Sequence, residues 1–240
     1  MKISLIMPAY NEQHTIREIV KKVCDTLQGI DYELLLVDDK STDETLLIMY
    51  ELQKQYGEQR IRVITKEHSG KSQTVKTGLL ASKGEYVVIQ DADMEYDPAD
   101  VLVMLEKIDK ENLDVVYGNR FGRNNEVVYY QNWLGNTLLS LFSAIITGVR
   151  ANMWPRDMEV CYKMAKGELY RKLAATIEST TNFGFEPEIT AKFSKVKGVK
   201  FAQVPISYYP RTVSEGKKMN AFKHGVEAFR EIIYYNFFAK

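Results

Sequence analysis

Short apolar runs alternate with amphipathic helical patterns through the first half of the chain, and no other sequence feature restricts the fold as strongly. Runs rich in branched and aromatic residues, typical of strands, lie at residues 3–9, 32–38, 61–65, 86–90 and 115–118. The segments between them carry apolar residues at helical spacing, over residues 15–27, 43–56, 73–81 and 98–108. Repeated alternation of this kind predicts an α/β fold with a mostly parallel sheet and helices on both of its faces.

The length and composition of the chain favour one large domain. Its 240 residues are 45% hydrophobic, which is enough to build one sizeable α/β core. No internal repeat, low-complexity tract or linker rich in Pro, Gly and Ser divides it. We expect a single domain over residues 1–218 and a C-terminal amphipathic helix over residues 219–240, which packs on the domain, on a partner or on a membrane surface.

Charge and cysteine content restrict the binding partners that we expect and the cellular compartment. Lys and Arg total 32 and Asp and Glu total 32, so no overall field favours nucleic acid, and any anion site must be local. Cys24 and Cys161 lie far apart in sequence, and no leader of the secretory type is recognised. We therefore expect a cytoplasmic protein without a structural disulfide. No run of about 18 strongly apolar residues is found, so we expect no membrane-spanning helix.

Two carboxylates, Asp91 and Asp93, follow directly after the apolar run 86–90. Open α/β sheets bind ligands outside the carboxyl ends of their strands. Mg²⁺ takes one or two carboxylates together with phosphate oxygens of a substrate. The pattern therefore predicts a divalent metal that holds a diphosphate, and the alternative is an ordinary acidic turn at a strand end.

The ends of the first two strands predict a nucleotide site without the common glycine-rich loops. Neither the G-x-G-x-x-G pattern nor the G-x-x-x-x-G-K-[ST] phosphate loop is present. Instead PAYNE follows the first strand at residues 8–12, and Asp38 and Asp39 end the second. Neighbouring strand ends lie side by side in such a sheet, so we expect Tyr10, Glu12 and Asp39 to converge on a base and ribose. In the alternative, Asp38 and Asp39 only cap the next helix.

Several motifs follow one another along the chain. In the first half they are PAYNE at residues 8–12, VDDKSTD at 37–43, SGKSQTVKTG at 69–78, DADMEYDP at 91–98 and YGNRF at 117–121. In this order they resemble the family-2 glycosyltransferases of the GT-A fold. The resemblance continues through DMEVCYK at residues 157–163, FEPEITAK at 185–192 and VPISYYPRTVSEGKK at 204–218. This second set is most similar to the branch that makes polyprenyl-phosphate sugars, the dolichyl-phosphate mannose synthase-like branch.

That resemblance implies positions for the donor and a metal. Asp91 and Asp93 match a D-x-D element, with Asp93 on the metal and Asp91 on the metal, the ribose or a metal-bound water, and Glu95 completes the metal shell. The implied metal is Mg²⁺ or Mn²⁺, which take hard oxygen ligands. The positions that match nucleotide-binding residues are Pro8, Ala9, Tyr10, Glu12, Asp39, Asp91 and Ala92. Lys71 lies near the base or ribose, unless it belongs to a solvated loop.

The family implies an inverting transfer of a hexose from a nucleotide sugar, UDP- or GDP-linked, but two acceptors stay open. A polyprenyl phosphate, with a second pKa of about 6, is largely dianionic at neutral pH and needs no strong base. A saccharide hydroxyl, as in polysaccharide or glycoconjugate assembly, needs a carboxylate within hydrogen-bond reach. Asp157 matches the family's catalytic acidic residue, and Glu159 is a second candidate for that role.

Basic side chains point to a phosphate on the acceptor or the donor. Arg120, in YGNRF, matches a family arginine that meets such a phosphate, and a guanidinium suits that role. Arg211, Lys217 and Lys218 belong to a segment that we expect to close over the diphosphate as a mobile loop, and a solvated basic loop is the alternative. Cys161 stands where many family members have glycine, which weakens the transfer of detailed geometry around it.

An uncharged segment over residues 131–149 has a narrow polar side. Weakly polar residues run along it at helical spacing, namely Asn136, Ser140, Ser143 and Thr147. The wide apolar arc predicts an interfacial helix on a membrane, and burial in the core or in a homodimer is the alternative. Aromatic residues over 229–238 indicate a second interfacial or partner-binding helix. Attachment would be peripheral, on the inner face of the membrane, or through a separate membrane subunit.

Two other classes of function fit the sequence less well. A nucleotidyltransferase would open with a Gly-rich basic turn after the first strand, where this chain has PAYNE at residues 8–12. A catalytically silent subunit that only binds nucleotide or a partner would have no need of Asp91, Asp93 and Asp157 together. We therefore expect an enzyme.

Overall fold

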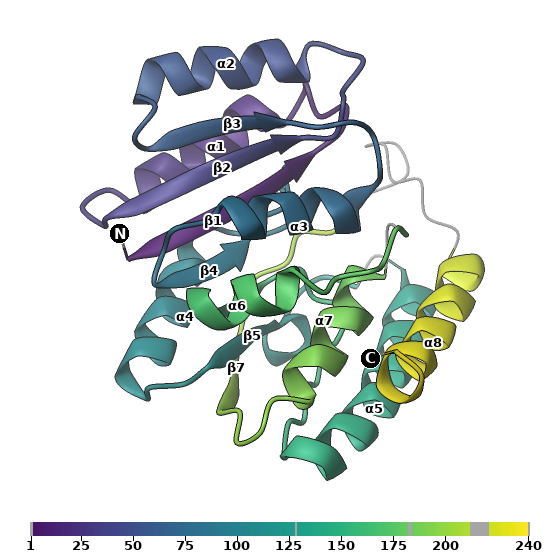
Figure 1. Ribbon diagram of the computed structural model, residues 1–240. Coiled ribbons are helices and arrows are strands. Elements are labelled where there is room, and N and C mark those ends of the chain that lie inside the picture. The colour runs from purple at the N-terminus through teal and green to yellow at the C-terminus, as the bar shows by residue number, and fades with distance from the viewer. Residues whose placement is uncertain (1, 128, 182–183, 212–220, 240) are drawn as a thin grey trace.

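A mostly parallel sheet lies at the centre of the computed structural model, which describes residues 2–127, 129–181, 184–211 and 221–239 (Figure 1). Its strands are β1 (Ile3–Ala9), β2 (Tyr32–Asp38), β3 (Ile61–Thr65), β4 (Tyr86–Ile89), β5 (Val115–Asn119), β6 (Lys163–Lys166) and β7 (Phe201–Pro205). Within the described residues these strands form one sheet in the order β3-β2-β1-β4-β6-β5-β7. Strand β6 is antiparallel to β4 and β5, and the other pairings are parallel.

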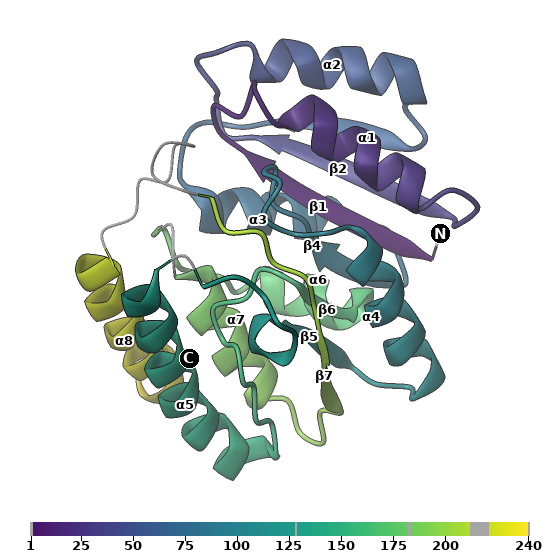
Figure 2. The same ribbon diagram turned by 180° about the vertical axis from the view of Figure 1, so that it is seen from behind.

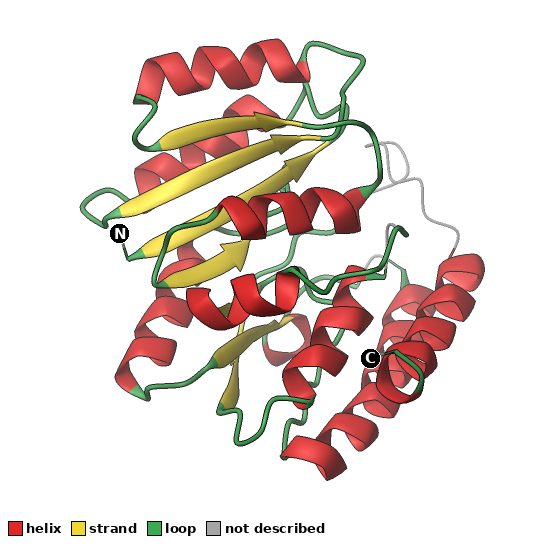
Figure 3. Ribbon diagram, in the orientation of Figure 1, coloured by secondary structure: helices red, strands yellow, loops and turns green. Residues whose placement is uncertain are grey.

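Helices cover both faces of the sheet, which confirms the predicted α/β architecture (Figure 3). They are α1 (Ile16–Thr26), α2 (Thr45–Tyr56), α3 (Lys71–Ala81), α4 (Ala99–Lys110), α5 (Tyr130–Ala151), α6 (Gly167–Ala174), α7 (Phe185–Ser194) and α8 (Ala221–Phe237). Helices α3 and α6 lie in front of the sheet in Figure 1, and α1 and α4 lie in front of it in the reverse view of Figure 2.

The inner strands form because their sequences are apolar on both sides. Every residue of β1 and β2 is buried, as expected for strands with helices on both faces. The bounds of β1, β2 and β3 match the predicted runs 3–9, 32–38 and 61–65. Helix α3 begins at Lys71, two residues before the predicted start, because the chain turns at Gly70, whose φ of 85° glycine adopts without strain.

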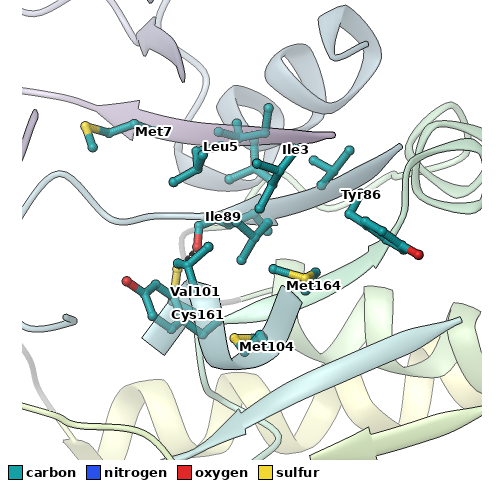
Figure 4. Packing of buried hydrophobic residues seen from close by; sticks show 14 of the residues in the cluster. Ile3, Leu5, Met7, Tyr86, Ile89, Val101, Met104, Cys161 and Met164 are labelled. Atoms are coloured by element: carbon teal, nitrogen blue, oxygen red, sulfur yellow. Dashed lines mark hydrogen bonds between the residues drawn. The ribbon is translucent and has the colours of Figure 1, made fainter. Parts of the chain in front are cut away.

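Apolar side chains from the sheet and from α4 form the core on the rear face (Figure 4). The buried residues that meet there include Ile3, Leu5, Met7, Tyr86, Ile89, Val101, Met104, Cys161 and Met164. Removal of this apolar surface from water is the main force that holds the sheet and the helices together. Cys161 and Cys24 are both buried free thiols.

The antiparallel strand β6 decides which segments meet at the carboxyl edge of the sheet. A parallel strand ends at that edge, whereas β6 begins there, so the segment before β6 lies beside the end of β5. The backbone N–H of Gly118 donates to the Tyr162 carbonyl at this junction, over 2.8 Å. After β7 the chain runs along the loop that follows β4, where Tyr208 forms an antiparallel bridge with Tyr96.

Helices α5 and α8 pack side by side, away from the sheet (Figures 1 and 2). The ring centroids of Phe142 and Phe229 are 5.0 Å apart, and Arg150 donates to Asn236 over 2.8 Å. Among the described residues, α5 is the one helix long and apolar enough to cross a bilayer, with 22 residues and a mean hydropathy of 1.3. Length and composition alone do not make α5 a spanning helix, so the expectation of no membrane-spanning helix stays a prediction.

Gly78 tests how tightly α3 packs on the sheet. A Cβ at this position would overlap the side chain of Ile6 and lie 3.1 Å from Val37 Cγ2. We predict that Gly78→Ala lowers the free energy of unfolding by about 1–3 kcal/mol, the usual cost of overpacking, in urea denaturation. Gly135→Ala is the matched control, since nothing lies within 4 Å of its added Cβ, and it should stabilise α5 by about 0.5–1 kcal/mol. Equal effects of the two substitutions would contradict the packing described.

Candidate active site

The predicted metal carboxylates lie around one cationic side chain at the carboxyl edge of the sheet. Arg211 places its NH2 nitrogen 2.7 Å from Asp93 Oδ2 and its Nε 3.8 Å from Glu95 Oε1. Its NH1 nitrogen is 3.9 Å from Glu12 Oε2. The structure thus brings together carboxylates from the loops after β1 and β4 with an arginine from the segment after β7.

The chemistry of this carboxylate group fits a hard divalent cation. Burial and the charges of Asp91 and Glu95 raise the pKa of Asp93 to about 7, although Arg211 opposes the shift. The carboxylate oxygens there suit Mg²⁺ or Mn²⁺. The Arg211 guanidinium supplies the positive charge among these oxygens. Among the described residues no three His, Cys, Asp or Glu side chains form a ready-made metal cluster. Asp91, Asp93 and Glu95 would therefore have to exchange their present partners to hold the metal.

Lys71 forms an ion pair with Asp91 of the D-x-D element. It is the first residue of α3 and does not belong to a solvated loop, which was the alternative. Its Nζ lies 2.7 Å from Asp91 Oδ1 and 3.9 Å from Glu186 Oε1. Burial lowers the pKa of Lys71, but the carboxylates of Asp91 and Glu186 outweigh it and hold that pKa well above the ordinary value. Ala92, between the two aspartates, is buried. Glu186 was not predicted from sequence, although it lies in the FEPEITAK motif.

The residues predicted to bind the nucleoside lie at the ends of β1 and β2, as expected. Pro8 and Ala9 end β1, and the Ala9 carbonyl accepts a hydrogen bond from Asp39 N over 2.9 Å. Tyr10 is exposed, and its ring centroid lies 4.6 Å from that of His68. A base could therefore reach an aromatic surface here. His68 was missed because a lone histidine in a loop gives no pattern.

Asp39 anchors the loop that leads into α3. Its carboxylate accepts hydrogen bonds from Ser69 N at 3.0 Å and Gly70 N at 2.9 Å, and Lys66 Nζ lies 2.6 Å away. Burial raises the pKa of Asp39, but these contacts outweigh it and lower that pKa below its ordinary value. Asp38, in contrast, caps the turn after β2 by accepting from Ser41 N.

Arg120 and Asp157 form a buried, bidentate ion pair close to the carboxylates that surround Arg211. Arg120 Nε lies 2.7 Å from Asp157 Oδ2 and its NH2 nitrogen 2.8 Å from Oδ1. Arg120 N and Asn136 Nδ2 also donate to Asp157, at 3.1 and 3.2 Å. Burial raises the pKa of Asp157, but Arg120 outweighs it and lowers that pKa. Both oxygens of Asp157 are thus engaged, which makes it a poor general base.

Tyr208 links the ion pair to Glu95. The Arg120 guanidinium lies 5.0 Å from the centre of its ring, and its hydroxyl donates to Glu95 Oε2 over 3.0 Å. Sequence reasoning placed Tyr208 in a motif but gave it no role. Lys217 and Lys218, predicted to contact the diphosphate, lie outside the described residues.

Glu159 is the one carboxylate of this edge, among the residues described, with a buried oxygen that has no hydrogen-bond partner. The side chain is half-buried. Burial, followed by the charge of Glu186, raises the pKa of Glu159 to about 8, against the opposing charge of Lys163. Burial thus favours the protonated form of Glu159, whereas Arg120 favours the ionised form of Asp157.

The Arg120–Asp157 pair makes a prediction for stability. Asp157→Ala leaves a buried guanidinium unpaired and should lower the free energy of unfolding by about 3–5 kcal/mol in urea at pH 7. Because the folded-state pKa of Asp157 is lowered, the wild-type stabilisation is present above an unfolded pKa of about 3.9 and disappears as the pH falls through the folded value. The difference between variant and wild type should therefore shrink in acid.

The exposed ion pair of Arg17 with Glu51 supplies the control. Glu51→Ala should cost less than about 1 kcal/mol, since solvent screens an exposed pair. A loss at Asp157 no larger than the loss at Glu51 would contradict the description of a buried, essential pair.

The chain is similar in sequence to known proteins over most of its length. The family model described as "Glycosyl transferase family 2" matches residues 4–182. A "Dolichol-phosphate mannosyltransferase" from Pyrococcus furiosus is 31% identical over 221 residues, which cover 90% of this chain and 59% of that protein. A "Dolichyl-phosphate beta-glucosyltransferase" from Dictyostelium discoideum is 25% identical over 243 residues, which cover 96% of this chain and 72% of the relative.

Solved structures establish the fold independently. Glucosyl-3-phosphoglycerate synthase from Mycobacterium tuberculosis, in complex with Mn²⁺, uridine diphosphate and glucosyl-3-phosphoglycerate, superposes with a TM-score of 0.71 at 18% identity. The match covers 98% of this chain and 79% of the synthase. The GT-A-like fold is thus shared, and with the family match over residues 4–182 the conclusion is that this chain belongs to glycosyl transferase family 2.

Proposed function

We propose that the protein transfers a hexose, with inversion, from a UDP- or GDP-linked sugar to a polyprenyl phosphate. The observation that carries this proposal is the pairing of Asp157 with Arg120 through both carboxylate oxygens. The residue that matches a catalytic base is thus engaged through both oxygens, which disfavours an acceptor whose proton it would have to take. The Pyrococcus and Dictyostelium relatives are both named for transfer to dolichyl phosphate, which supports the same acceptor.

The donor would lie across the ends of β1, β2 and β4. Tyr10 offers its exposed ring to the base. Asp91, Asp93 and Glu95 would hold Mg²⁺ or Mn²⁺, which when bound supplies a Lewis acid for the leaving diphosphate. The manganese complex of the Mycobacterium synthase supports this assignment.

The bond changes place no demand on a protein base. An oxygen of the acceptor phosphate attacks the anomeric carbon from the side opposite the diphosphate, so a C–O bond to the acceptor forms as the C–O bond to the diphosphate breaks. A dianionic phosphate has no proton to lose in this step. Arg120 would orient the acceptor phosphate and offset its charge.

Helix α5 connects this site to an exposed apolar surface. Its buried side carries the polar stripe: Asn136 donates to Asp157, and Ser140 accepts from Met158 N over 2.8 Å. The opposite side exposes large apolar residues, namely Leu134, Leu138, Leu141, Ile145 and Val149. Helix α8 adds Phe229, Tyr234 and Phe237, and Phe238 follows directly after it. A helix in a soluble core would bury its apolar side and expose its polar side. Helix α5 does the opposite.

We propose that this apolar surface lies on the inner leaflet of a membrane, with the protein peripheral on its cytoplasmic side. A polyprenyl phosphate keeps its chain in the bilayer and its phosphate at the headgroup level, and α5 would meet both. An interfacial position suits α5 better than a spanning one, because its polar side is hydrogen-bonded within the site.

Transfer to a saccharide hydroxyl is the second candidate, and Glu159 is the observation that favours it. Its pKa, raised to about 8 by burial and by Glu186, would suit a general base. Glu159→Gln therefore separates the two acceptors without removing a member of the Arg120–Asp157 pair.

The first test follows a radiolabelled hexose from UDP- and GDP-linked donors, with Mg²⁺ or Mn²⁺, onto a short-chain polyprenyl phosphate. Wild type and Glu159→Gln should label the lipid at rates within about tenfold of each other, and Asp93→Ala should be slower by at least about 100-fold. The unphosphorylated polyprenol is the control acceptor. Label only in a saccharide, with a loss of about 10²–10⁴-fold in Glu159→Gln, would move the assignment to the hydroxyl acceptor.

The second test measures binding to vesicles that contain anionic lipid. The double substitution Leu138→Glu and Leu141→Glu should abolish co-flotation, because charges on the exposed side of α5 cannot enter the interface. The control is Leu47→Glu on α2, which is 60% exposed like the two test residues at 58% each. If wild type fails to float and instead elutes as a dimer that the double substitution dissociates, the surface is a protein interface.

A further inference from the structure

Arg211 is bound less completely than the other arginine of the site. Its Nε is buried and has no hydrogen-bond partner among the residues described, and its contacts to Glu12 and Glu95 are 3.9 and 3.8 Å long. Arg120, in contrast, meets Asp157 through two short bonds of 2.7 and 2.8 Å. One short hydrogen bond, from its NH2 nitrogen to Asp93 Oδ2 over 2.7 Å, therefore holds the Arg211 guanidinium, so another cation could exchange with it more easily than with Arg120.

The oxygens that Arg211 occupies are those a metal would need. Asp93 Oδ2 accepts from the Arg211 side chain at 2.7 Å, and Asp93 Oδ1 accepts from Glu95 N at 3.0 Å. Glu95 Oε1 accepts from the Arg211 backbone N–H at 2.9 Å, and Glu95 Oε2 from Tyr208 at 3.0 Å. A divalent ion on Asp93 would stand within a few ångströms of the guanidinium, and two cations that close repel each other.

The surroundings leave the Arg211 side chain room to move while its backbone stays fixed. Tyr209 N donates to the Glu95 carbonyl over 2.8 Å, and Tyr208 bridges to Tyr96, so the segment before Arg211 is anchored. A cleft of ≈ 420 Å³ opens beside the side chain, lined by residues that include Met94, Asn125 and Arg211 itself. Exchange of the guanidinium therefore requires only rotation of one side chain.

We propose that Arg211 is a built-in counter-cation, which neutralises the metal carboxylates in the free protein and leaves them when a metal-bound nucleoside diphosphate arrives. The inference rests on the donor half of the proposed function. A metal ion alone must displace the guanidinium without giving it a new partner. A metal with a diphosphate supplies that partner, because the released guanidinium can donate to phosphate oxygens.

The consequence is a coupling between metal and nucleotide. Nucleoside diphosphate should raise the affinity for the metal, and the metal should raise the affinity for the nucleotide by the same factor. Without the guanidinium at position 211, the metal alone would bind more tightly and the coupling would weaken. This result would distinguish exchange from a purely structural role of Arg211. If the role were structural, substitution of Arg211 would weaken metal binding or leave it unchanged.

Titration calorimetry with Mn²⁺, alone and with UDP or GDP present, tests the proposal. Arg211→Gln keeps most of the side-chain size and removes the charge, and it should bind Mn²⁺ alone at least about tenfold more tightly than wild type. The gain in Mn²⁺ affinity that nucleotide confers should shrink by a similar factor. Arg123→Gln is the control, since Arg123 pairs with Asp100, away from Asp93, and it should match wild type.

Thermal denaturation provides a second readout that does not depend on heats of binding. Without metal, Arg211→Gln should melt below wild type, because its carboxylates repel one another, and Mn²⁺ should raise its Tm by more than it raises that of wild type. Mn²⁺ affinity of Arg211→Gln equal to or weaker than that of wild type would overturn the exchange and leave the proposed function standing. Unchanged Mn²⁺ binding in Asp93→Ala would overturn the metal assignment, and with it the donor half of that function.

Discussion

The buried ion pair between Arg120 and Asp157 is the contact on which the candidate site depends. It joins the end of β5 to the segment before β6. Asn136 of α5 donates to Asp157, and the ring of Tyr208, after β7, lies against Arg120, so these two segments contact the pair as well. Neither charge could stay buried without the other, so the pair fixes where these segments lie. It also restricts the chemistry, because a carboxylate engaged through both oxygens is not free to take a proton.

Charge matching extends across the whole edge of the sheet. Lys71 forms an ion pair with Asp91, and Arg211 forms one with Asp93, at 2.7 Å each. Both aspartates of the D-x-D element therefore have cationic partners in the free protein. The equal totals of 32 acidic and 32 basic residues conceal this local order. In the proposed mechanism, substrate binding would exchange ionic partners, which costs less than burying an unpaired charge. Helix α5 links this polar edge to an exposed apolar surface.

The sequence predicted the features that depend on local pattern, and missed those that depend on packing. Alternating apolar runs predicted β1 to β5, and D-x-D spacing with the family motifs singled out Asp91, Asp93, Arg120 and Asp157 as candidates. Strands β6 and β7 were not predicted, because they have only four and five residues and β6 carries two lysines, and the antiparallel direction of β6 was not predicted either. The polar stripe of α5 was recognised, but its inward orientation follows from the bond of Asn136 to Asp157, a partner 21 residues away. Similarly, no local pattern places an arginine on the metal carboxylates.

In the proposed reaction a phosphate dianion attacks without the help of a protein base. Single-turnover transfer, followed from pH 5 to 9 with a polyprenyl phosphate and with the matching phosphonate, tests it most directly. The phosphonate loses its second proton at a higher pH, so the rise in rate should shift upward with it, in wild type and in Glu159→Gln alike. An inflection that stays at the same pH for both acceptors, and disappears in Glu159→Gln, would show that a carboxylate takes the proton and would contradict the claim.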